Sequence, residues 1–392
     1  MKHVSLEAPD SLDAHVAKDV SVERHLTDFF TKETAEKSAF LTMESEVSNS
    51  NPLVTGLQYD SKKIKPGNLF FALHGKHTDV SVNADNANSV CANAVHENIV
   101  CAINNGAAVI VYDDDRITKN NDIVYIKVKN VRFAMSPISA AFYYFPSKRL
   151  LITGVTGKEG KSTTVYLIWQ LLTMMGKKAG FISTRHLCLG KEIFSNNEQH
   201  TTPEAPVIQR LLYEMADNGC EFAILEASTR GLSIKTNRLG DVEFCSGVLT
   251  NLAHEHPEDW EQYRDDKANL FRALNSYIPP ANSSFSGPFG VANADDKNSR
   301  YFIKLTKHKT FTYSPAGRDG DIILEAIESG AWGNWYMAMI PALKERIEIR
   351  DKLPGAINSA NVLASILTVS GLLKLPLREI TPFVKRLKLL KE

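Results

Sequence analysis

A β-rich run leads into a glycine-containing turn and then into a helical pattern, and this succession constrains the fold more than any other feature of the sequence. Residues 150–155 (LLITGV) predict a strand, and residues 162–176 predict a helix that ends at Gly176. Two further buried-type strands follow at 221–228 and 244–252. A last long helix, whose buried face is too mixed to assign, lies near the carboxyl end of the chain. Alternating strands and helices predict an α/β fold with a mostly parallel sheet.

The turn itself, Gly-Val-Thr-Gly-Lys-Glu-Gly-Lys-Ser-Thr-Thr at 154–164, is typical of a phosphate-binding loop. Glycines let backbone N–H groups approach phosphate oxygens, and the following helix start adds partial positive charge. Lys161 supplies a full charge for the β- and γ-phosphates, and the Ser162 hydroxyl suits Mg²⁺. Val155 stands where a strict P-loop has its first glycine, and the spacing is not that of a dinucleotide fingerprint. A plain glycine turn is the alternative, but the position between strand and helix favours a nucleoside triphosphate.

Three positions further along are candidates for metal or charge chemistry. Glu226 ends a predicted strand, where it is either a solvated strand end or, beside a phosphate loop, a second Mg²⁺ contact. His254 and His256 are either a loop pair or part of a metal site, and no third nitrogen or sulfur ligand follows at a useful spacing. Lys267, on an amphipathic helical pattern, is by default a solvated lysine.

The amino-terminal part of the chain has a different character. Residues 1–50 carry ten acidic and five basic residues, and only HLTDFF and FLTM offer apolar anchors there, which predicts a mobile acidic extension that docks one short helix. From residue 53 to about 113 the pattern is strand-like, with turn chemistry at 65–68 and an irregular insertion at 81–98. A helix near 131–145 ends at a proline. We therefore expect an extension at 1–50, a small α/β domain at 51–147 and a larger α/β domain at 148–392.

Composition excludes several classes of protein. The 45 basic and 45 acidic residues leave no net charge, which argues against a generally basic nucleic-acid binder. Five cysteines without a C-x-x-C pair favour a reducing compartment over a disulfide framework or a zinc ribbon. Neither a signal peptide nor a membrane-length apolar run is visible, so we expect a cytoplasmic protein with no membrane partner.

Taken in order, the motifs resemble those of a known family. They are GVTGKEGKSTT at 154–164, HTTPE at 200–204, LEASTRGL at 225–232, TNLAHEH at 250–256 and YRDDKANLF at 263–271. This order resembles the Mur ligases of peptidoglycan synthesis, and within them the chain is most similar to the MurE group. Residues 56–61 and 65–73 resemble the UDP-binding domain of that family. The resemblance runs from about residue 53 to the end of the chain.

The resemblance implies a role for each matching position. ATP binding falls to the loop and to two asparagines near the adenosine: Gly157, Lys158, Glu159, Gly160, Lys161, Ser162, Thr163, Asn358 and Asn361. Magnesium ligands are implied at Ser162, Glu226, His256 and a carbamylated Lys267, and the catalytic set is Lys161, Glu226, His256 and Lys267. The UDP-muropeptide is implied to contact Ser61 near the uracil, and Thr201, Thr202, Ser228 and Arg238 elsewhere.

Several positions depart from the family pattern. Ser228-Thr229-Arg230 replaces a Ser-Ser-His motif, and the segment leading to Arg238 is two residues longer, which weakens that assignment. Glu255 stands where the family has an aspartate, and Ala356 where an arginine is common. The resemblance also implies a third, carboxy-terminal domain that receives the incoming amino acid, and we expect this sequence to lack it.

The implied reaction is the ATP-dependent addition of a free amino acid to UDP-MurNAc-L-Ala-D-Glu through an acyl phosphate. Because we expect the third domain to be lacking, a second hypothesis is a truncated module that binds the nucleotide or the UDP-muropeptide without closing the bond, or that depends on a separate chain to supply the missing domain.

Overall fold

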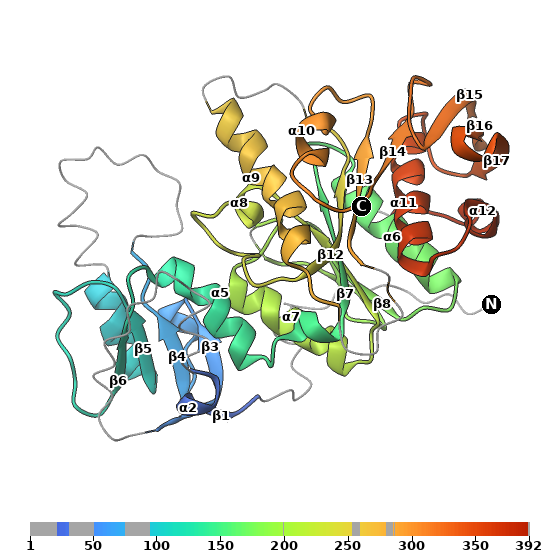
Figure 1. Cartoon of the computed structure of the whole chain (residues 1–392). Helices are drawn as coiled ribbons and strands as arrows, with labels where there is room; N and C mark the ends of the chain where they lie inside the picture. Colours follow the sequence, from blue (N-terminus) through green and yellow to red (C-terminus); the bar gives the residue numbers. More distant parts are fainter. Residues whose placement is uncertain are drawn as a thin grey trace.

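The computed structural model describes residues 22–30, 51–74, 95–198, 200–252, 259–279, 285 and 287–390. These residues form a mixed α/β structure with sheets of two, four and eleven strands. The four-stranded and eleven-stranded sheets lie at opposite sides of the view in Figure 1, with helices α5 (Val131–Phe142) and α7 (Ala205–Asp217) between them. The α/β fold predicted from the sequence is confirmed.

The smaller parallel sheet has the order β3 (Gly56–Gln58), β4 (Asn68–Phe71), β5 (Val109–Tyr112) and β6 (Val124–Lys127). Every residue of β4 and β5 is buried, and since successive side chains point to opposite sides of a sheet, both of its faces are covered there. Leu69 and Phe71 enter a core shared with α5, whereas Phe70 enters a core shared with a helix over residues 95–104. That helix begins inside the segment expected to be irregular, so the irregular assignment is wrong for residues 95–98.

Residues 22–30 complete the core of this smaller sheet. Strand β1 (Arg24–His25) pairs with β2 (Leu53–Val54), and the short helix α2 (Leu26–Phe29) buries Leu26 and Phe29. The Phe29 ring meets the Phe142 ring of α5 edge to face at 5.1 Å between centroids. One short helix of the expected extension thus docks, at the HLTDFF anchor, whereas the FLTM anchor and the other residues expected in the extension lie outside the described ranges.

Seven parallel strands form the centre of the larger sheet. In sheet order they are β8 (Ala179–Ile182), β11 (Phe222–Glu226), β7 (Leu151–Thr156), β12 (Phe244–Leu249), β13 (Phe289–Asn293), β14 (Thr310–Ser314) and β15 (Ile322–Gly330). Antiparallel strands extend both ends: β9 (His186–Cys188) and β10 (Ile193–Ser195) on one side, β16 (Gly333–Ile340) and β17 (Glu345–Asp351) on the other. The predicted parallel sheet is confirmed, and the antiparallel ends add to it.

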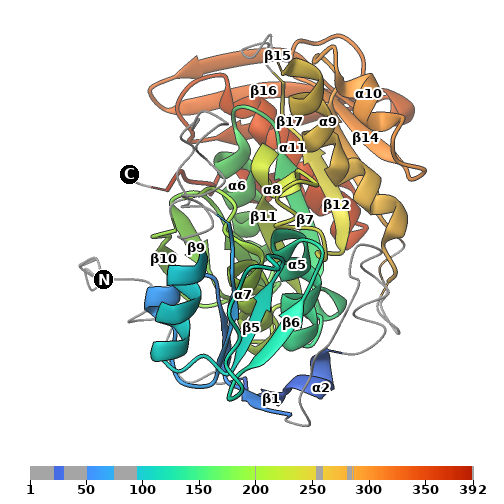
Figure 2. The same cartoon turned by 90° about the vertical axis from the view of Figure 1, so that its left-hand side faces the viewer.

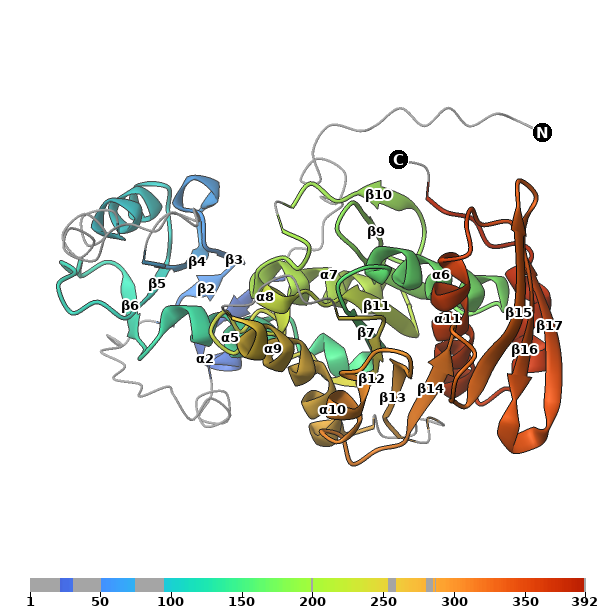
Figure 3. The same cartoon turned by 90° about the horizontal axis from the view of Figure 1, so that it is seen from above.

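Helices cover both faces of this sheet (Figures 2 and 3). Helices α6 (Lys161–Met174), α11 (Asn358–Leu373) and α12 (Leu377–Val384) share one core, while α7, α8 (Thr229–Leu232), α9 (Trp260–Ala273) and α10 (Ser299–Ile303) lie on the other face. Helix α11 packs against both α6 and α12. It is therefore buried around most of its circumference, which explains why its sequence shows no single apolar stripe.

Helix α5 connects the two large sheets through side-chain contacts. The Tyr143 ring, just after α5, lies 5.9 Å from that of Tyr213 on α7, and Asn237 Nδ2 donates to the Phe133 carbonyl at 3.0 Å. Strands β7, β11 and β12 are parallel neighbours, so the loops that follow them lie together at the carboxyl-terminal ends of the strands. Among the described helices, none has the length and apolar character that crossing a membrane requires.

Candidate active site

The glycine turn between β7 and α6 adopts backbone conformations that favour glycine. Gly157 has φ +141° and Gly160 has φ +77°. A Cβ atom on Gly157 would lie 2.0 Å from Thr250 Oγ1, and one on Gly160 would lie 2.3 Å from Asn361 Oδ1. Both glycines are therefore required by conformation and by close packing.

The loop is held from the neighbouring strand by the two residues that follow β12. The Asn251 carbonyl accepts from Lys158 N at 2.8 Å, and Asn251 Oδ1 accepts from Glu159 N at 3.1 Å. Thr250 Oγ1 donates to the Glu159 carbonyl at 2.6 Å. These contacts fix the loop backbone before any ligand binds. The Thr-Asn pair was visible in the sequence only as part of a family motif.

Lys161 is the first residue of α6, a helix of 14 residues whose start faces the loop. Its Nζ donates to the Lys158 carbonyl at 2.6 Å and lies 3.9 Å from Glu226 Oε1. The ammonium group is thus folded back over the loop, where a phosphate group would gain both its charge and the partial charge of the helix start.

Glu226 ends β11 directly beside the loop-bearing strand, since it is in register with Val155 of β7. One carboxylate oxygen, Oε2, accepts from Ser162 Oγ at 2.9 Å, Ser183 Oγ at 3.0 Å, and both the N and Oγ1 of Thr184 at 3.0 Å. The other oxygen, Oε1, lies on the Lys161 side. Glu226 is therefore a fixed carboxylate at the loop and not the solvated strand end that was the alternative.

Ser183 and Thr184 were not singled out from the sequence. They follow β8, the next parallel strand beyond β11, and so reach the same edge of the sheet. The sequence signal that could have identified them is a pair of small polar residues directly after a buried strand.

Lys267, on α9, is 3% exposed, so its default interpretation as a solvated lysine is wrong. Its Nζ donates to the Gly157 carbonyl at 2.8 Å and lies 4.8 Å from the centre of the Tyr263 ring. Burial, and to a smaller extent the nearby Lys161 charge, lower the pKa of Lys267 to about 7, while Glu226 acts in the opposite direction.

The candidate metal ligands are only partly described. Ser162, Glu226 and Lys267 meet around the loop, whereas His256 lies outside the described residues, as does His254. Within the part of the chain that the structure describes, no group of three or more His, Cys, Asp or Glu side chains could hold a metal ion. Any ligand set would therefore combine the Glu226 carboxylate with groups of other kinds or with residues outside the described ranges.

Asn358 and Asn361, at the start of α11, border the loop from the other side. Asn361 Oδ1 accepts from Thr164 Oγ1 at 3.3 Å, and Asn361 Nδ2 donates to Asn358 Oδ1 at 3.1 Å. Asn358 is tied in turn to the Pro354 carbonyl at 2.7 Å. Thr163 is half-buried on the first turn of α6.

The candidate muropeptide contacts divide between two places. Thr202 Oγ1 lies 2.9 Å from Ser228 Oγ and 3.0 Å from the Glu226 carbonyl, so this pair adjoins the phosphate loop, with Thr201 half-buried next to it. Ser61 starts a short 3-10 helix that follows β3 of the smaller sheet, and its Oγ donates to Asn98 Oδ1 at 3.2 Å.

Arg238 is 4% exposed and already bound by protein acceptors. Its Nη1 donates to the Thr202 carbonyl at 2.8 Å and its Nη2 to Glu204 Oε1 at 2.8 Å. Burial lowers the pKa of Arg238, with Glu204 opposing. Glu204 was part of a quoted motif but was not identified as a site residue.

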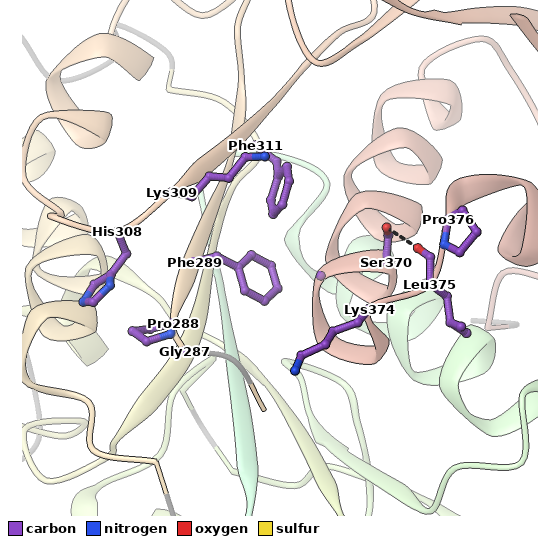
Figure 4. A pocket seen from close by; sticks show the side chains of 11 residues that line it. Gly287, Pro288, Phe289, His308, Lys309, Phe311, Ser370, Lys374, Leu375 and Pro376 are labelled. Atoms are coloured by element: carbon purple, nitrogen blue, oxygen red, sulfur yellow. Dashed lines mark hydrogen bonds between the residues drawn. The ribbon is translucent and has the colours of Figure 1, made fainter. Parts of the chain in front are cut away.

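A separate pocket of about 490 Å³ lies away from this site (Figure 4). It opens where β13 and β14 begin, at the amino-terminal ends of the parallel strands, whereas the phosphate loop lies at their carboxyl-terminal ends. The Phe289 side chain points toward α11. It is lined by residues 287–289, 308, 309, 311, 370, 371 and 374–376. None of the candidate site residues lines it.

Residues 155–369 match the family profile described as the Mur ligase middle domain. A curated relative, the UDP-N-acetylmuramyl-tripeptide synthetase of Treponema denticola, is 36% identical over 385 residues, covering 92% of this chain and 69% of the relative. A UDP-N-acetylmuramoyl-L-alanyl-D-glutamate–2,6-diaminopimelate ligase structure superimposes with a TM-score of 0.67 at 22% identity, covering 86% of this chain and 64% of the other.

The MurF ligase of Thermotoga maritima, solved in complex with ADP, shares the fold with a TM-score of 0.54 at 16% identity, covering 83% of this chain and 65% of the other. The chain spans between 60 and 69% of the length of the curated relatives that it matches. The matched profile covers more than half of the chain and includes the phosphate loop, Glu226 and Lys267. The chain belongs to the Mur ligase family.

Proposed function

We propose that this chain carries the ATP and UDP-muropeptide sites of a MurE-like ligase, which joins an amino acid to UDP-MurNAc-L-Ala-D-Glu through an acyl phosphate. The observation that carries the proposal is the meeting of Lys161, Glu226 and Lys267 at one glycine loop. Two lysines and one carboxylate, all largely buried, form a site for a polyanion together with a cation.

The loop fits a nucleoside triphosphate. Two positive-φ glycines keep side chains away from the phosphate position, and the 14-residue helix α6 begins at that position. Lys158, Glu159 and Thr163 flank the same turn and complete the proposed phosphate contacts. Asn358 and Asn361, on the far side of Gly160, are proposed to lie near the adenosine.

Magnesium is proposed to be held by Ser162, Glu226, His256 and Lys267. When bound, it would neutralise charge on the phosphate oxygens. The described donors fit this role: Ser162 Oγ is already 2.9 Å from Glu226 Oε2, and the hydroxyls of Ser183 and Thr184 fix that carboxylate.

Lys267 is further proposed to be carbamylated. A buried amine with a pKa of about 7 is substantially neutral at physiological pH, and only the neutral amine attacks CO₂. The reaction forms an N–C bond, releases a proton and leaves a carboxylate in place of a buried cation. The new negative charge would lie near Lys161 and add an oxygen donor for the metal.

The muropeptide is proposed to extend from Ser61, which follows β3 of the smaller sheet, to Thr201, Thr202 and Ser228 beside the loop, with Arg238 supporting them. The D-Glu side-chain carboxylate would attack the γ-phosphorus, the bond to the ADP oxygen would break, and the amine would then displace phosphate from the acyl carbon. Lys161 stabilises the charge on the transferred group. The free cysteines Cys188, Cys220 and Cys245 agree with a place of action in the reducing cytoplasm.

The shared length with the relatives favours a second candidate. This candidate is a module that binds the nucleotide or the UDP-muropeptide and closes the bond only with a separate chain that receives the amino acid; the chain itself spans 60–69% of the length of these relatives.

One assay distinguishes the two candidates. The purified chain is incubated with ATP, Mg²⁺ and UDP-MurNAc-L-Ala-D-Glu, with and without a diamino acid, and the UDP-muropeptides are resolved by mass. A tripeptide product establishes ligation by this chain. ADP release that needs the dipeptide substrate, without a tripeptide, supports the module. Absence of both nucleotide and UDP-muropeptide binding refutes the proposal.

A further inference from the structure

Glu204 occupies an unusual place between the two large sheets. It is the N-cap residue of α7, yet its side chain makes no capping hydrogen bond to that helix. Its side chain is 3% exposed, and Oε1 accepts from two guanidinium groups: Arg238 Nη2 at 2.8 Å and Arg132 Nη1 at 3.1 Å. The carboxylate is thus turned away from its own helix toward two arginines.

The two arginines come from different parts of the fold. Arg132 lies on α5, which packs on the smaller sheet, and Arg238 follows α8 on the larger sheet. Tyr59, which follows β3 of the smaller sheet, faces the same charges: its pKa is raised by burial and by Glu198 and Glu204, with Arg238 opposing. Glu204 is therefore a shared acceptor at the junction of the two sheets.

From Glu204 a continuous set of hydrogen bonds leads to the phosphate site. Arg238 joins the carboxylate to the Thr202 carbonyl, and Thr202 Oγ1 lies against Ser228 and the Glu226 carbonyl. Ser228 N in turn donates to Thr202 Oγ1 at 3.0 Å. Each residue in this path is held by the one before it.

We propose that Glu204 is a positioning residue: through Arg238 it sets the place of Thr202 and Ser228, and through Arg132 it ties them to α5. The buried Oε1 of Glu204 accepts one charge-assisted hydrogen bond from each guanidinium group, and a neutral amide in its place would hold both arginines less strongly. The inference rests on the proposed function, because the ligand affected is the UDP-muropeptide. Small displacements of binding groups are costly, since hydrogen bonds to a ligand depend steeply on geometry.

The test uses the full chain and two ligands. Calorimetric titration gives Kd values for UDP-MurNAc-L-Ala-D-Glu and for Mg²⁺ with a non-hydrolysable ATP analogue. Glu204→Gln is expected to raise the Kd of the UDP-muropeptide at least tenfold and that of the ATP analogue less than twofold. Glu204→Asp, which keeps the charge but shortens the side chain, is expected to fall between the unsubstituted chain and Glu204→Gln.

Glu214→Gln is the matched control. Glu214 lies on the same helix and forms another largely buried ion pair, with Arg210 Nη1 at 2.7 Å, but it has no contact with Thr202. A purely structural effect would weaken both ligands, or would appear equally in Glu214→Gln. Either of those results, or unchanged UDP-muropeptide binding by Glu204→Gln, overturns the positioning role.

If Glu204→Gln does not fold, Glu204→Asp decides the question by the same split between ligands. Failure of the unsubstituted chain to bind the UDP-muropeptide would refute the proposed function itself. Binding by the unsubstituted chain together with equal binding by the folded Glu204 variant overturns only the inference made here.

Discussion

At the scale of single residues, the site is organised around one carboxylate. Four donors fix Oε2 of Glu226, so the carboxylate cannot rotate without losing several hydrogen bonds at once. Its other oxygen is left on the side of Lys161. One oxygen thus anchors the carboxylate while the other lies toward the loop, an arrangement that suits a group presenting a fixed negative charge to a cation.

Replacing that charge should therefore affect phosphoryl transfer far more than muropeptide binding. We predict that Glu226→Gln lowers dipeptide-dependent ADP release at least 100-fold, roughly the cost of losing one preorganised charge interaction. Thr202 contacts only the backbone carbonyl of Glu226, so UDP-muropeptide affinity should change little. The control is Glu221→Gln, an exposed residue just before the same strand. Equal ADP release by both variants would contradict the role given to Glu226.

Lys267 gives a pH prediction whose sign follows from its lowered pKa. The unfolded chain keeps the proton on this lysine up to about pH 10.4, whereas the folded chain loses it near pH 7. Between these values the unfolded state binds more protons, so the contribution of Lys267 to the free energy of unfolding rises with pH.

The measurement is thermal unfolding of the chain without nucleotide, in CO₂-free buffer, from pH 7 to pH 10. Stability relative to Lys267→Met should increase across this range, since methionine removes the proton linkage but keeps an unbranched side chain. A difference in stability that stays constant with pH would contradict the lowered pKa of Lys267 in the folded chain.

At the scale of secondary-structure elements, the phosphate loop is wedged between two elements far apart in sequence. Thr250 and Asn251 hold it from the end of β12, and Asn361 of α11 touches Gly160. The shape of the loop thus depends on the packing of α11 against α6.

Gly160 and Gly176 have the same φ of +77°, so substitutions at the two positions can distinguish the cost of the backbone conformation from the cost of this packing. At Gly176 an added Cβ meets nothing within 4 Å, whereas at Gly160 it meets Asn361 Oδ1. We predict that Gly176→Ala lowers the free energy of unfolding by about 1 kcal/mol, the ordinary cost of a left-handed alanine. Gly160→Ala should cost more and should also weaken binding of the ATP analogue. Chemical denaturation and calorimetry measure both; equal effects of the two substitutions would show that the contact with Asn361 is unimportant.

The same scale shows what the sequence could predict. Strands β7, β11 and β12 were predictable because each is a short apolar run before polar or glycine-rich residues, and their parallel arrangement follows from alternation with helices. Strands β15 to β17 were not, because most of β15 is exposed and lacks a regular apolar pattern. The residues alone predicted a solvated Lys267, whereas the side chain is buried. An amphipathic pattern marks this position as polar but does not reveal that the phosphate loop covers it. The division at residues 147 and 148 stays a prediction.

At the scale of the whole molecule, residues 22–30 and helix α5 link the smaller sheet to the rest of the structure. Phe29 packs on Phe142 of α5, and α5 contacts α7 and Glu204. The amino-terminal helix is therefore part of the folded unit that would carry the UDP-binding residues.

We predict that Phe29→Ala, which empties a fully buried aromatic position, destabilises this unit by about 3–5 kcal/mol. Hydrogen exchange of the amides in β4, β5 and α5 measures the loss locally, where a single global unfolding energy would mix two units. Leu53→Ala, at a side chain that is 42% exposed, is the control and should have a much smaller effect. Unchanged protection in Phe29→Ala would show that α2 is dispensable.

Under either candidate function, the loop ending in Lys161 is proposed to bind a triphosphate beside Glu226. Calorimetric titration of Mg²⁺ with a non-hydrolysable ATP analogue into the chain and into Lys161→Ala tests it most directly. We predict one site per chain, an affinity at least tenfold weaker in Lys161→Ala, and UDP-muropeptide affinity changed less than twofold. No binding by the unsubstituted chain, or equal nucleotide binding by both proteins, would contradict the account.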